Sequence, residues 1–348
     1  MGELLGLGVT HYPGLSGKPG RNASFFIDYG LQNPALPENL RTPAGWPEPM
    51  RREWADDKGA AAVETHRQAL IKNLREARKA LDDFNPDFVL IWGDDQYENF
   101  TEDIIPPFCV LAYDSVDIRP WSGESPAFGG NIWNEPEDKT FTVKVHQEAA
   151  KYLARGLLEA GIDVSYAYQP LHKPLGHAFI NTVLFLDWDR KGFPYPILPV
   201  AVNCYGSRVI SFKGFRGEPT AEPDPPGPSP KRCFEMGAVT GRLLAESPWR
   251  VALIASSSWS HANLASKNYY LYPDIESDRK LLKALKEGDY EAWKNRPLSA
   301  IEESGQQELL NWFPLMGAMA ELGRRVNRTE WVESWVNNSP KCFAYFNP

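Results

Sequence analysis

The sequence predicts a single α/β domain, 1–348, in which helices pack on the faces of a central β-sheet. Short β-rich apolar runs alternate along the chain with amphipathic helical patterns, and this alternation is typical of α/β sheets. The alternation resumes after each of the irregular stretches, so none of them marks a domain boundary. A chain of 348 residues is also long enough to bury a sizeable core.

The expected strands are short runs rich in β-branched and aliphatic residues. They are "LLGLGVT" (4–10), "DFVLIW" (87–92), "IDVSYAY" (162–168), "PILPVAVN" (196–203) and "VALIASS" (251–257). The expected helices lie between and after them and carry apolar residues at a period of about 3.6. They cover 60–82, 143–160, 231–246, 276–286 and 301–322.

Three segments depart from this rhythm. Residues 12–58 are rich in Gly, Pro and Asn, and we expect them to form a long covering loop. Residues 217–230, "GEPTAEPDPPGPSP", are expected to form a Pro-rich surface loop, because each proline removes a backbone donor and fixes φ. The tail, 323–348, is expected to be the closing segment of the same domain.

The composition is that of an ordinary globular protein, with 43% hydrophobic and 24% charged residues. A formal net charge of −8 argues against nucleic acid or an anionic membrane as a partner. No apolar run approaches the roughly 20 residues that a spanning helix needs, and the first residues show no signal-peptide pattern. We therefore expect a cytoplasmic protein. The cysteines have no metal-type spacing and are expected to be buried thiols: Cys109, Cys204, Cys233 and Cys342.

Groups able to bind a metal or move protons follow several of the expected strands. In open α/β sheets, ligands bind beyond the carboxyl ends of the strands, so this repeated placement predicts a functional site. His66 and His146 lie inside helical patterns instead and are expected to be structural. The strand-end groups are His11, residues 94–98 ("DDQYE"), His172, His177 and residues 258–261 ("SWSH").

The helical pattern 301–322 adds a carboxylate. Glu308 shares a face with Trp312, Leu315 and Met319, so that face should be buried. Because an unpaired buried carboxylate is costly, Glu308 needs a cation, an arginine or a proton. A salt bridge to a buried arginine is one reading, and a metal ligand near the strand-end histidines is the favoured one.

With these residues, the chain resembles the class III extradiol ring-cleavage dioxygenases, of the type that includes protocatechuate 4,5-dioxygenase β subunits. The similar stretches run in family order along most of the chain, with 12–60 and 214–230 poorly covered. The resemblance implies an α/β fold with a mixed central sheet. The stretches are "GVTHYPGL" (8–15), "DDQYENFTEDIIPPFCV" (94–110), "LGHAFINTVLFL" (175–186), "LPVAVNCY" (198–205), "KRCFEMG" (231–237), "ASSSWSHANL" (255–264) and "SGQQELLNWFPLMGAM" (304–319).

The resemblance also implies a mononuclear Fe(II) held by two histidines and one glutamate, with open positions for a catecholate and O2. Matched position by position, the first histidine ligand falls on His11 and the glutamate on Glu308. The catalytic acid/base histidine falls on His261, and a further active-site histidine falls on His177.

The second histidine ligand of the family is where this sequence departs from it, because Gln96 stands in that position. An amide oxygen is a neutral and weaker donor than imidazole, and Asp95 or Glu98 offers a carboxylate nearby. Three outcomes follow: an altered shell of His11, Gln96 or Asp95, and Glu308; a harder ion such as Mn(II); or loss of the metal, which the retained residues make the least favoured.

The implied chemistry is O2-dependent ring opening of a catechol-like, aminophenol or hydroxylated heteroaromatic substrate, with His261 as base and then acid. One rival is a metal-dependent hydrolase or lyase in which Asp95 or Glu98 activates water. Another is a non-catalytic binding homologue. A serine hydrolase is disfavoured because no GxSxG elbow is present. The resemblance further suggests a homo-oligomer.

Overall fold

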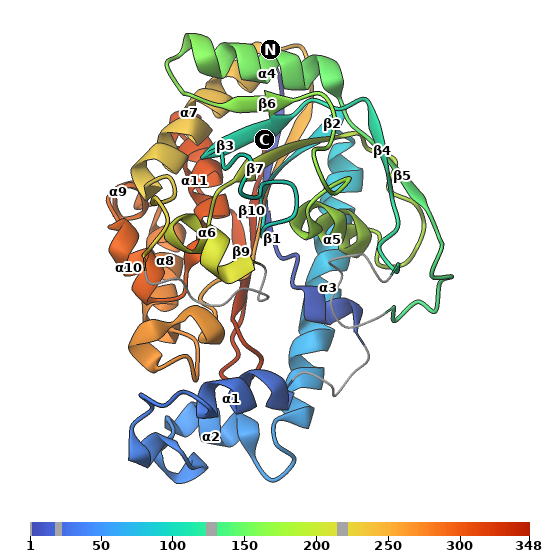
Figure 1. The fold of residues 1–348 in the computed structure, drawn as a ribbon. Helices are drawn as coiled ribbons and strands as arrows, with labels where there is room; N and C mark the ends of the chain where they lie inside the picture. Colours follow the sequence, from blue (N-terminus) through green and yellow to red (C-terminus); the bar gives the residue numbers. More distant parts are fainter. Residues whose placement is uncertain (1, 18–22, 123–130, 214–221) are drawn as a thin grey trace.

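An eight-stranded sheet lies at the centre of the fold, in the order β6-β3-β7-β2-β8-β1-β10-β9 (Figure 1). The structure, a computed structural model, describes residues 2–17, 23–122, 131–213 and 222–348. A separate two-stranded sheet pairs β4 with β5. The strands are β1 (Leu4–Val9), β2 (Phe88–Asp94), β3 (Phe108–Leu111), β4 (Ser115–Ile118), β5 (Phe141–Lys144), β6 (Ser165–Ala167), β7 (Ile197–Val202), β8 (Val251–Ser256), β9 (Arg328–Val332) and β10 (Lys341–Phe346).

The sheet is mixed. β7, β2, β8 and β1 are parallel neighbours, whereas β3 runs antiparallel to β7 and β10 antiparallel to β1. Every residue of the parallel strands is buried, as expected for strands with both faces covered, which read as continuous apolar runs. The predicted α/β architecture with a mixed sheet flanked by helices is confirmed.

Helices cover both faces of this sheet (Figure 1). α4, α7, α8, α9 and α11 share one apolar core with alternate strand residues such as Leu90, and α3 and α5 share a second core with the residues between them, such as Ile91. The helices are α1 (Ala23–Leu31), α2 (Glu48–Trp54), α3 (Ala60–Phe84), α4 (Gln147–Glu159), α5 (His177–Leu186), α6 (Val209–Phe212), α7 (Pro230–Glu246), α8 (Ile275–Glu287), α9 (Tyr290–Lys294), α10 (Leu298–Glu303) and α11 (Trp312–Glu321).

Two of the helix predictions need correction. Residues 301–322 are not one helix: α10 ends at Glu303, a 3-10 turn η8 (Gln307–Asn311) follows, and α11 begins at Trp312. The break falls at Gly305, whose φ of +69° is outside the helical region. Residues 143–160 likewise divide into the end of β5 and α4, and His146 is the N-cap of α4, where its ring accepts the backbone N–H of Ala149.

The segment 12–58 is not all loop either. It contains α1 and α2 together with 3-10 turns, and residues 18–22 lie outside the described residues. Its apolar side chains form a third small core with the loops after β8 and β9, which explains how a segment with little periodicity is held. The members of this core are Ile27, Leu36, Trp46, Met50, Leu271 and Val336.

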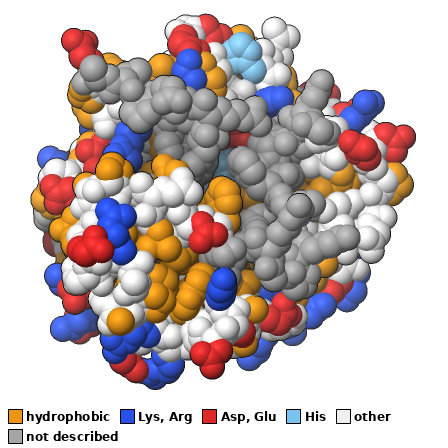
Figure 2. Space-filling model, turned by 60° about the horizontal axis from the view of Figure 1, so that its bottom comes forward, with side chains coloured by type: hydrophobic (Ala, Val, Ile, Leu, Met, Phe, Trp, Pro, Cys, Tyr) orange, Lys and Arg blue, Asp and Glu red, His pale blue; other side chains and the backbone are white. Residues whose placement is uncertain are grey.

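The remaining expectations concern loops, cysteines and the surface. Residues 222–229 of the Pro-rich segment are irregular and 217–221 lie outside the described residues. All four cysteines are buried free thiols, as predicted. Among the described residues, no helix combines the length and apolarity that a membrane span requires. Figure 2 shows basic and acidic side chains interspersed around the rim of one face.

Candidate metal centre

Three neighbouring parallel strands end together at one edge of the sheet. β2, β8 and β1 are adjacent; Asp94 and Ser256 are the last residues of β2 and β8, and His11 follows β1 by two positions. On one side this edge meets the start of α5 at His177, and on the other the turn η8 with Glu308. His11, Asp94 and Ser256 therefore lie at the carboxyl ends of neighbouring strands, which for His11 and Asp94 is the placement that the sequence predicts.

His11 is held with one ring nitrogen free. Its Nδ1 lies 3.2 Å from Ser256 Oγ, which lies 2.6 Å from Thr182 Oγ1, and the Thr182 hydroxyl donates to the carbonyl of Ala178. Since Thr182 has a single proton, Ser256 donates to Thr182 and accepts from His11 Nδ1–H. Nε2 of His11 then carries the lone pair, and it is buried without a hydrogen-bond partner among the described residues. This is the form of histidine that binds metals.

Two buried carboxylates face this nitrogen. Asp94 Oδ1 lies 3.4 Å and Glu308 Oε2 lies 3.6 Å from His11 Nε2. Ligand atoms that sit about 2.1 Å from one ion are roughly 3.0–3.4 Å apart at angles between octahedral and tetrahedral. The two distances from His11 Nε2 lie within a few tenths of an ångström of that range.

Gln96 lies across the far side of the same carboxylates. Its Nε2 donates to Asp94 Oδ2 at 3.0 Å and to Glu308 Oε1 at 2.9 Å. Two further donors hold the carboxylates: Tyr205 Oη reaches Glu308 Oε1 at 2.8 Å, and Asn311 Nδ2 reaches Asp94 Oδ1 at 2.9 Å. The structure thus brings Gln96 to the site, and its predicted role as a metal ligand stays a prediction.

His261 approaches Glu308 from the loop after β8. Its Nε2 lies 3.4 Å from Glu308 Oε2, and its backbone N–H donates to the carbonyl of Gly305 at 2.8 Å. A Cβ at residue 305 would come within 2.5 Å of the His261 carbonyl oxygen, so this approach requires glycine there. Ser260 instead donates to Asp278 through both its backbone N–H and its hydroxyl, away from any nucleophilic role.

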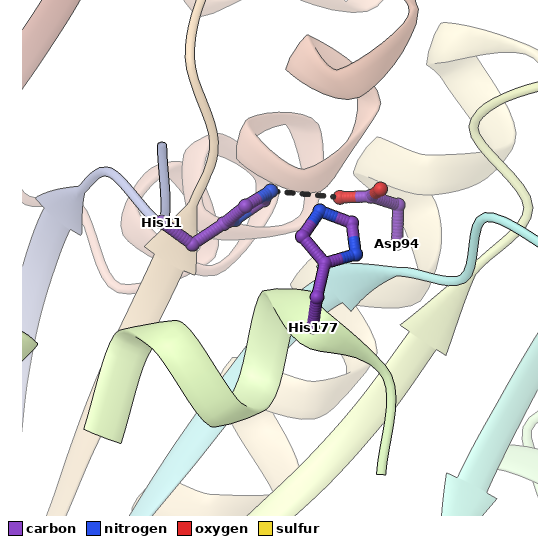
Figure 3. A group of neighbouring side chains, drawn as sticks. All are labelled: His11, Asp94 and His177. Atoms are coloured by element: carbon purple, nitrogen blue, oxygen red, sulfur yellow. Dashed lines mark ion pairs between the residues drawn. The ribbon is translucent and has the colours of Figure 1, made fainter. Parts of the chain in front are cut away.

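His177 begins α5 and is fixed by Glu98. Glu98 accepts the backbone N–H of His177 at 3.0 Å, and its carboxylate lies 3.1 Å from the ring Nδ1. The ring stands at 85° to that of His11, with 5.1 Å between the ring centroids. Figure 3 shows the other ring nitrogen of His177 pointing toward the Asp94 carboxylate. His11, Asp94 and His177 offer ligand atoms that all lie within 4.8 Å of one another.

Neither acid proposed beside Gln96 joins this group. Asp95 accepts the backbone N–H groups of Glu98, Asn99 and Phe100, and so caps the turn after β2. Glu98 is engaged by His177. Sequence reasoning placed Asp94 among the strand-end groups of the site but did not name it as a metal ligand. Strand alternation was the available signal, because residues 94 and 96 share one side of the chain and residue 95 points to the other.

Burial and charge set the protonation of the cluster. Burial lowers the pKa of His11, against the opposing effect of Asp94 and Glu308. Burial and the charge of Glu308 raise the pKa of Asp94. Burial alone would raise the pKa of Glu308, but His261 and His11 hold it below its usual range. Two carboxylates buried side by side repel one another, and a divalent cation between them would remove that cost.

The flanking histidines have pKa values shifted upward. Burial would lower the pKa of His177, but the Glu98 carboxylate outweighs it and raises the value to about 9. Burial would also lower the pKa of His261, but the charge of Glu308 outweighs burial and raises it. His172, also named from the sequence, lies outside the cluster: it is exposed, and its Nε2 lies 3.0 Å from Asp103.

Curated relatives share modest identity with this chain, and no family model matches it. A 2,3-dihydroxyphenylpropionate/2,3-dihydroxicinnamic acid 1,2-dioxygenase of Photorhabdus laumondii is 25% identical over 241 residues, 69% of this chain and 62% of that protein. One of Pseudomonas putida is 28% identical over 190 residues, 54% of this chain and 48% of that protein. One of Rhodococcus sp is 26% identical over 292 residues, 75% of this chain and 85% of that protein.

The matches therefore span about half to three-fifths of the first two relatives. Among solved structures, a mutant pyrrolidone carboxyl peptidase from P. furiosus is 18% identical, with a TM-score of 0.26 over 50% of this chain and 76% of that chain. A score this low supports no structural inference.

Proposed function

We propose that this chain is a metal-dependent dioxygenase of the extradiol type, which opens the ring of a catechol-like substrate with O2. One observation carries the proposal: the buried Nε2 of His11 has no hydrogen-bond partner among the described residues and faces the carboxylates of Asp94 and Glu308. The relatives are named dioxygenases of dihydroxylated aromatic acids, which supports the same class of reaction.

The proposed metal ligands are His11, Glu308 and a third group from the Asp94–Gln96 pair. These residues fit a divalent ion, because two buried carboxylate oxygens lie within 3.6 Å of a lone-pair nitrogen. When bound, Fe(II), or Mn(II) in an oxygen-rich shell, would supply positions for two adjacent substrate oxygens and for O2.

His261 is proposed as the acid/base. Its Nε2 lies 3.4 Å from Glu308 Oε2, so the ring stands beside a proposed ligand. In this position it accepts a proton from a substrate hydroxyl and returns it when the ring opens. His177, held by Glu98 through Nδ1, is proposed to orient the substrate through its other ring nitrogen.

The substrate class extends to aminophenols and hydroxylated heteroaromatics, which also present two adjacent donor atoms. The partners are then a small aromatic substrate and O2. A hydrolase or lyase that activates water with Asp95 or Glu98 is disfavoured, because the first caps a turn and the second pairs with His177.

The test is an isotope experiment on protein reconstituted anaerobically with Fe(II), or separately with Mn(II). A panel of catechols, aminophenols and hydroxypyridines is supplied together with ¹⁸O2. The proposal expects a ring-opened product that carries both oxygen atoms of one O2 molecule. Turnover of the same substrates in the absence of O2 would contradict it and favour hydrolysis or lysis.

A further inference from the structure

We infer that Asp94 is the third metal ligand and that Gln96 is a positioning residue, whose amide ties the two ligand carboxylates together. The inference rests on the proposed function, since it concerns the same metal. It assigns a shell of one histidine and two carboxylates, His11, Asp94 and Glu308, in place of the shell with Gln96 expected from the sequence.

The oxygens of the two carboxylates divide into two sets. Asp94 Oδ2 and Glu308 Oε1 both accept from Gln96 Nε2, at 3.0 and 2.9 Å. Asp94 Oδ1 and Glu308 Oε2 are the oxygens that face His11 Nε2, at 3.4 and 3.6 Å. Gln96 thus binds one oxygen of each carboxylate, and the other oxygen of each carboxylate faces the orphaned nitrogen of His11.

The polarity of Gln96 argues against its own coordination. Carboxylates accept hydrogen bonds and do not donate them, so the amide end between Asp94 and Glu308 must be the NH2 group. A Gln96 turned to coordinate through Oε1 would place an oxygen against two carboxylates and leave both without this donor. The cost of such an arrangement in a buried site is high.

Asp94 is also the more rigidly placed of the two residues. It is the last residue of β2, it pairs in register with Val202 of β7, and its side chain is fully buried. Asn311 anchors its Oδ1 at 2.9 Å and also donates to the carbonyl of Ser256 at the end of β8. A carboxylate oxygen has two lone pairs, so Oδ1 keeps one for the metal. Gln96 lies beyond the strand and is only half-buried.

The metal preference follows from this shell. Compared with two histidines and one carboxylate, it exchanges an imidazole for a second anionic oxygen. Carboxylate-rich shells suit harder ions such as Mn(II), whereas imidazole suits Fe and Zn. We therefore expect the chain to hold Mn(II) with an affinity close to that for Fe(II), and Asp94→His to shift the preference toward Fe(II).

The experiment compares Mn(II) binding to the full chain and its variants by equilibrium dialysis under anaerobic conditions. Asp94→Asn is expected to lose at least about 100-fold in affinity, as for a lost ligand, and Gln96→Ala roughly 10-fold, as for a lost support of a ligand. Gln68→Ala, an exposed glutamine of α3, is the control and is expected to bind as the unaltered chain does.

A loss at Gln96→Ala as large as that at Asp94→Asn would overturn the inference, and so would unaltered binding by Asp94→Asn. If the unaltered chain itself holds no metal, the proposed function fails instead. A crystal structure of the unaltered chain with Mn(II) is the check that needs no variant. It should show Mn(II) bonded to Asp94 with Gln96 still against both carboxylates, and a bond to Gln96 Oε1 would refute the assignment.

Discussion

At the scale of single residues, the site depends on which hydrogen bonds its side chains keep and which they leave open. Ser256 Oγ hydrogen-bonds to Nδ1 of His11, and the Gln96 amide hydrogen-bonds to one oxygen of Asp94 and one oxygen of Glu308. The other ring nitrogen of His11 faces the second oxygen of each carboxylate. A hydrogen-bonded frame of this kind orients ligands before a metal arrives, which raises affinity for it.

Replacing Ser256 tests this frame. Ser256→Ala removes the acceptor for His11 Nδ1–H, so the ring loses its fixed tautomer and orientation. We expect metal affinity to fall by about 10- to 100-fold while the fold is kept. Equilibrium dialysis measures the change, and Ser266→Ala, at an exposed position, is the matched control. Unchanged affinity in Ser256→Ala would show that this hydrogen bond does not prepare His11.

Replacing His261 separates proton transfer from metal binding. His261→Gln removes the proposed acid/base but none of the proposed ligands, so metal content should stay unchanged. We expect kcat to fall by about 10²- to 10⁴-fold, the usual contribution of a positioned acid/base. Oxygen uptake and metal analysis on one preparation give both values. His172→Gln, at an exposed histidine, is the control, and full activity in His261→Gln would remove His261 from the chemistry.

At the scale of elements, Glu308 is positioned by how α11 packs against α7. The two helices touch through glycine: a Cβ at Gly317 would lie 1.9 Å from the carbonyl oxygen of Phe234, and one at Gly237 would lie 1.9 Å from that of Pro314. Since η8 leads directly into α11, the closeness of this packing fixes how far Glu308 extends toward His11.

Gly317→Ala is therefore expected to push the helices apart. Its Cβ meets backbone rather than a movable side chain, so the variant should lose about 1–3 kcal/mol in the free energy of unfolding, as for an overpacked core. Urea unfolding followed by circular dichroism measures the loss. Glu321→Ala, at an exposed position of the same helix, should change stability little. Equal stability of the unaltered chain and Gly317→Ala would mean that the packing is looser than described.

The sequence predicted the parallel strands of the main sheet better than the antiparallel ones. β1, β2, β7 and β8 lie within or beside the expected runs, because strands buried on both faces read as continuous apolar sequence. β3, β9 and β10 were not predicted. In β9 most residues are only partly buried, so a short edge strand of this kind lacks a distinctive pattern.

The site was predicted in part for a similar reason. His11, His177, His261 and Glu308 were named from strand ends, a helix face and the resemblance, and they lie together. The helix-face argument gave the burial of Glu308 correctly but not its 3-10 turn, which depends on the positive φ of Gly305. Asp94 was named only as one of the strand-end groups, because its role depends on the direction of its side chain, which composition does not reveal.

At the scale of the whole molecule, buried histidines link stability to pH. His66 of α3 is 4% exposed, and burial, with Lys341 nearby, lowers its pKa well below 6.5. The native chain therefore keeps His66 neutral at pH values where the unfolded chain binds a proton. Stability is unaffected above pH about 6.5 and is lost as the pH falls below it.

His66→Leu should remove this part of the acid lability. Each pH unit in the window below about 6.5 costs the unaltered chain up to about 1.4 kcal/mol through one such histidine. Urea unfolding at a series of pH values between about 4 and 8 gives the free energy of unfolding against pH for the unaltered chain and for the variant. The variant should show the shallower slope, and parallel curves would mean that His66 is protonated in the folded chain.

Metal content tests the central claim, that His11 and its facing carboxylates form a metal site. The measurement is the metal stoichiometry of the unaltered chain and of His11→Ala after anaerobic reconstitution with Fe(II) and removal of unbound ion. The account predicts about one ion per chain in the unaltered protein, as for a mononuclear site, and close to none in the variant. Equal metal content in the two proteins, or none in either, would contradict it.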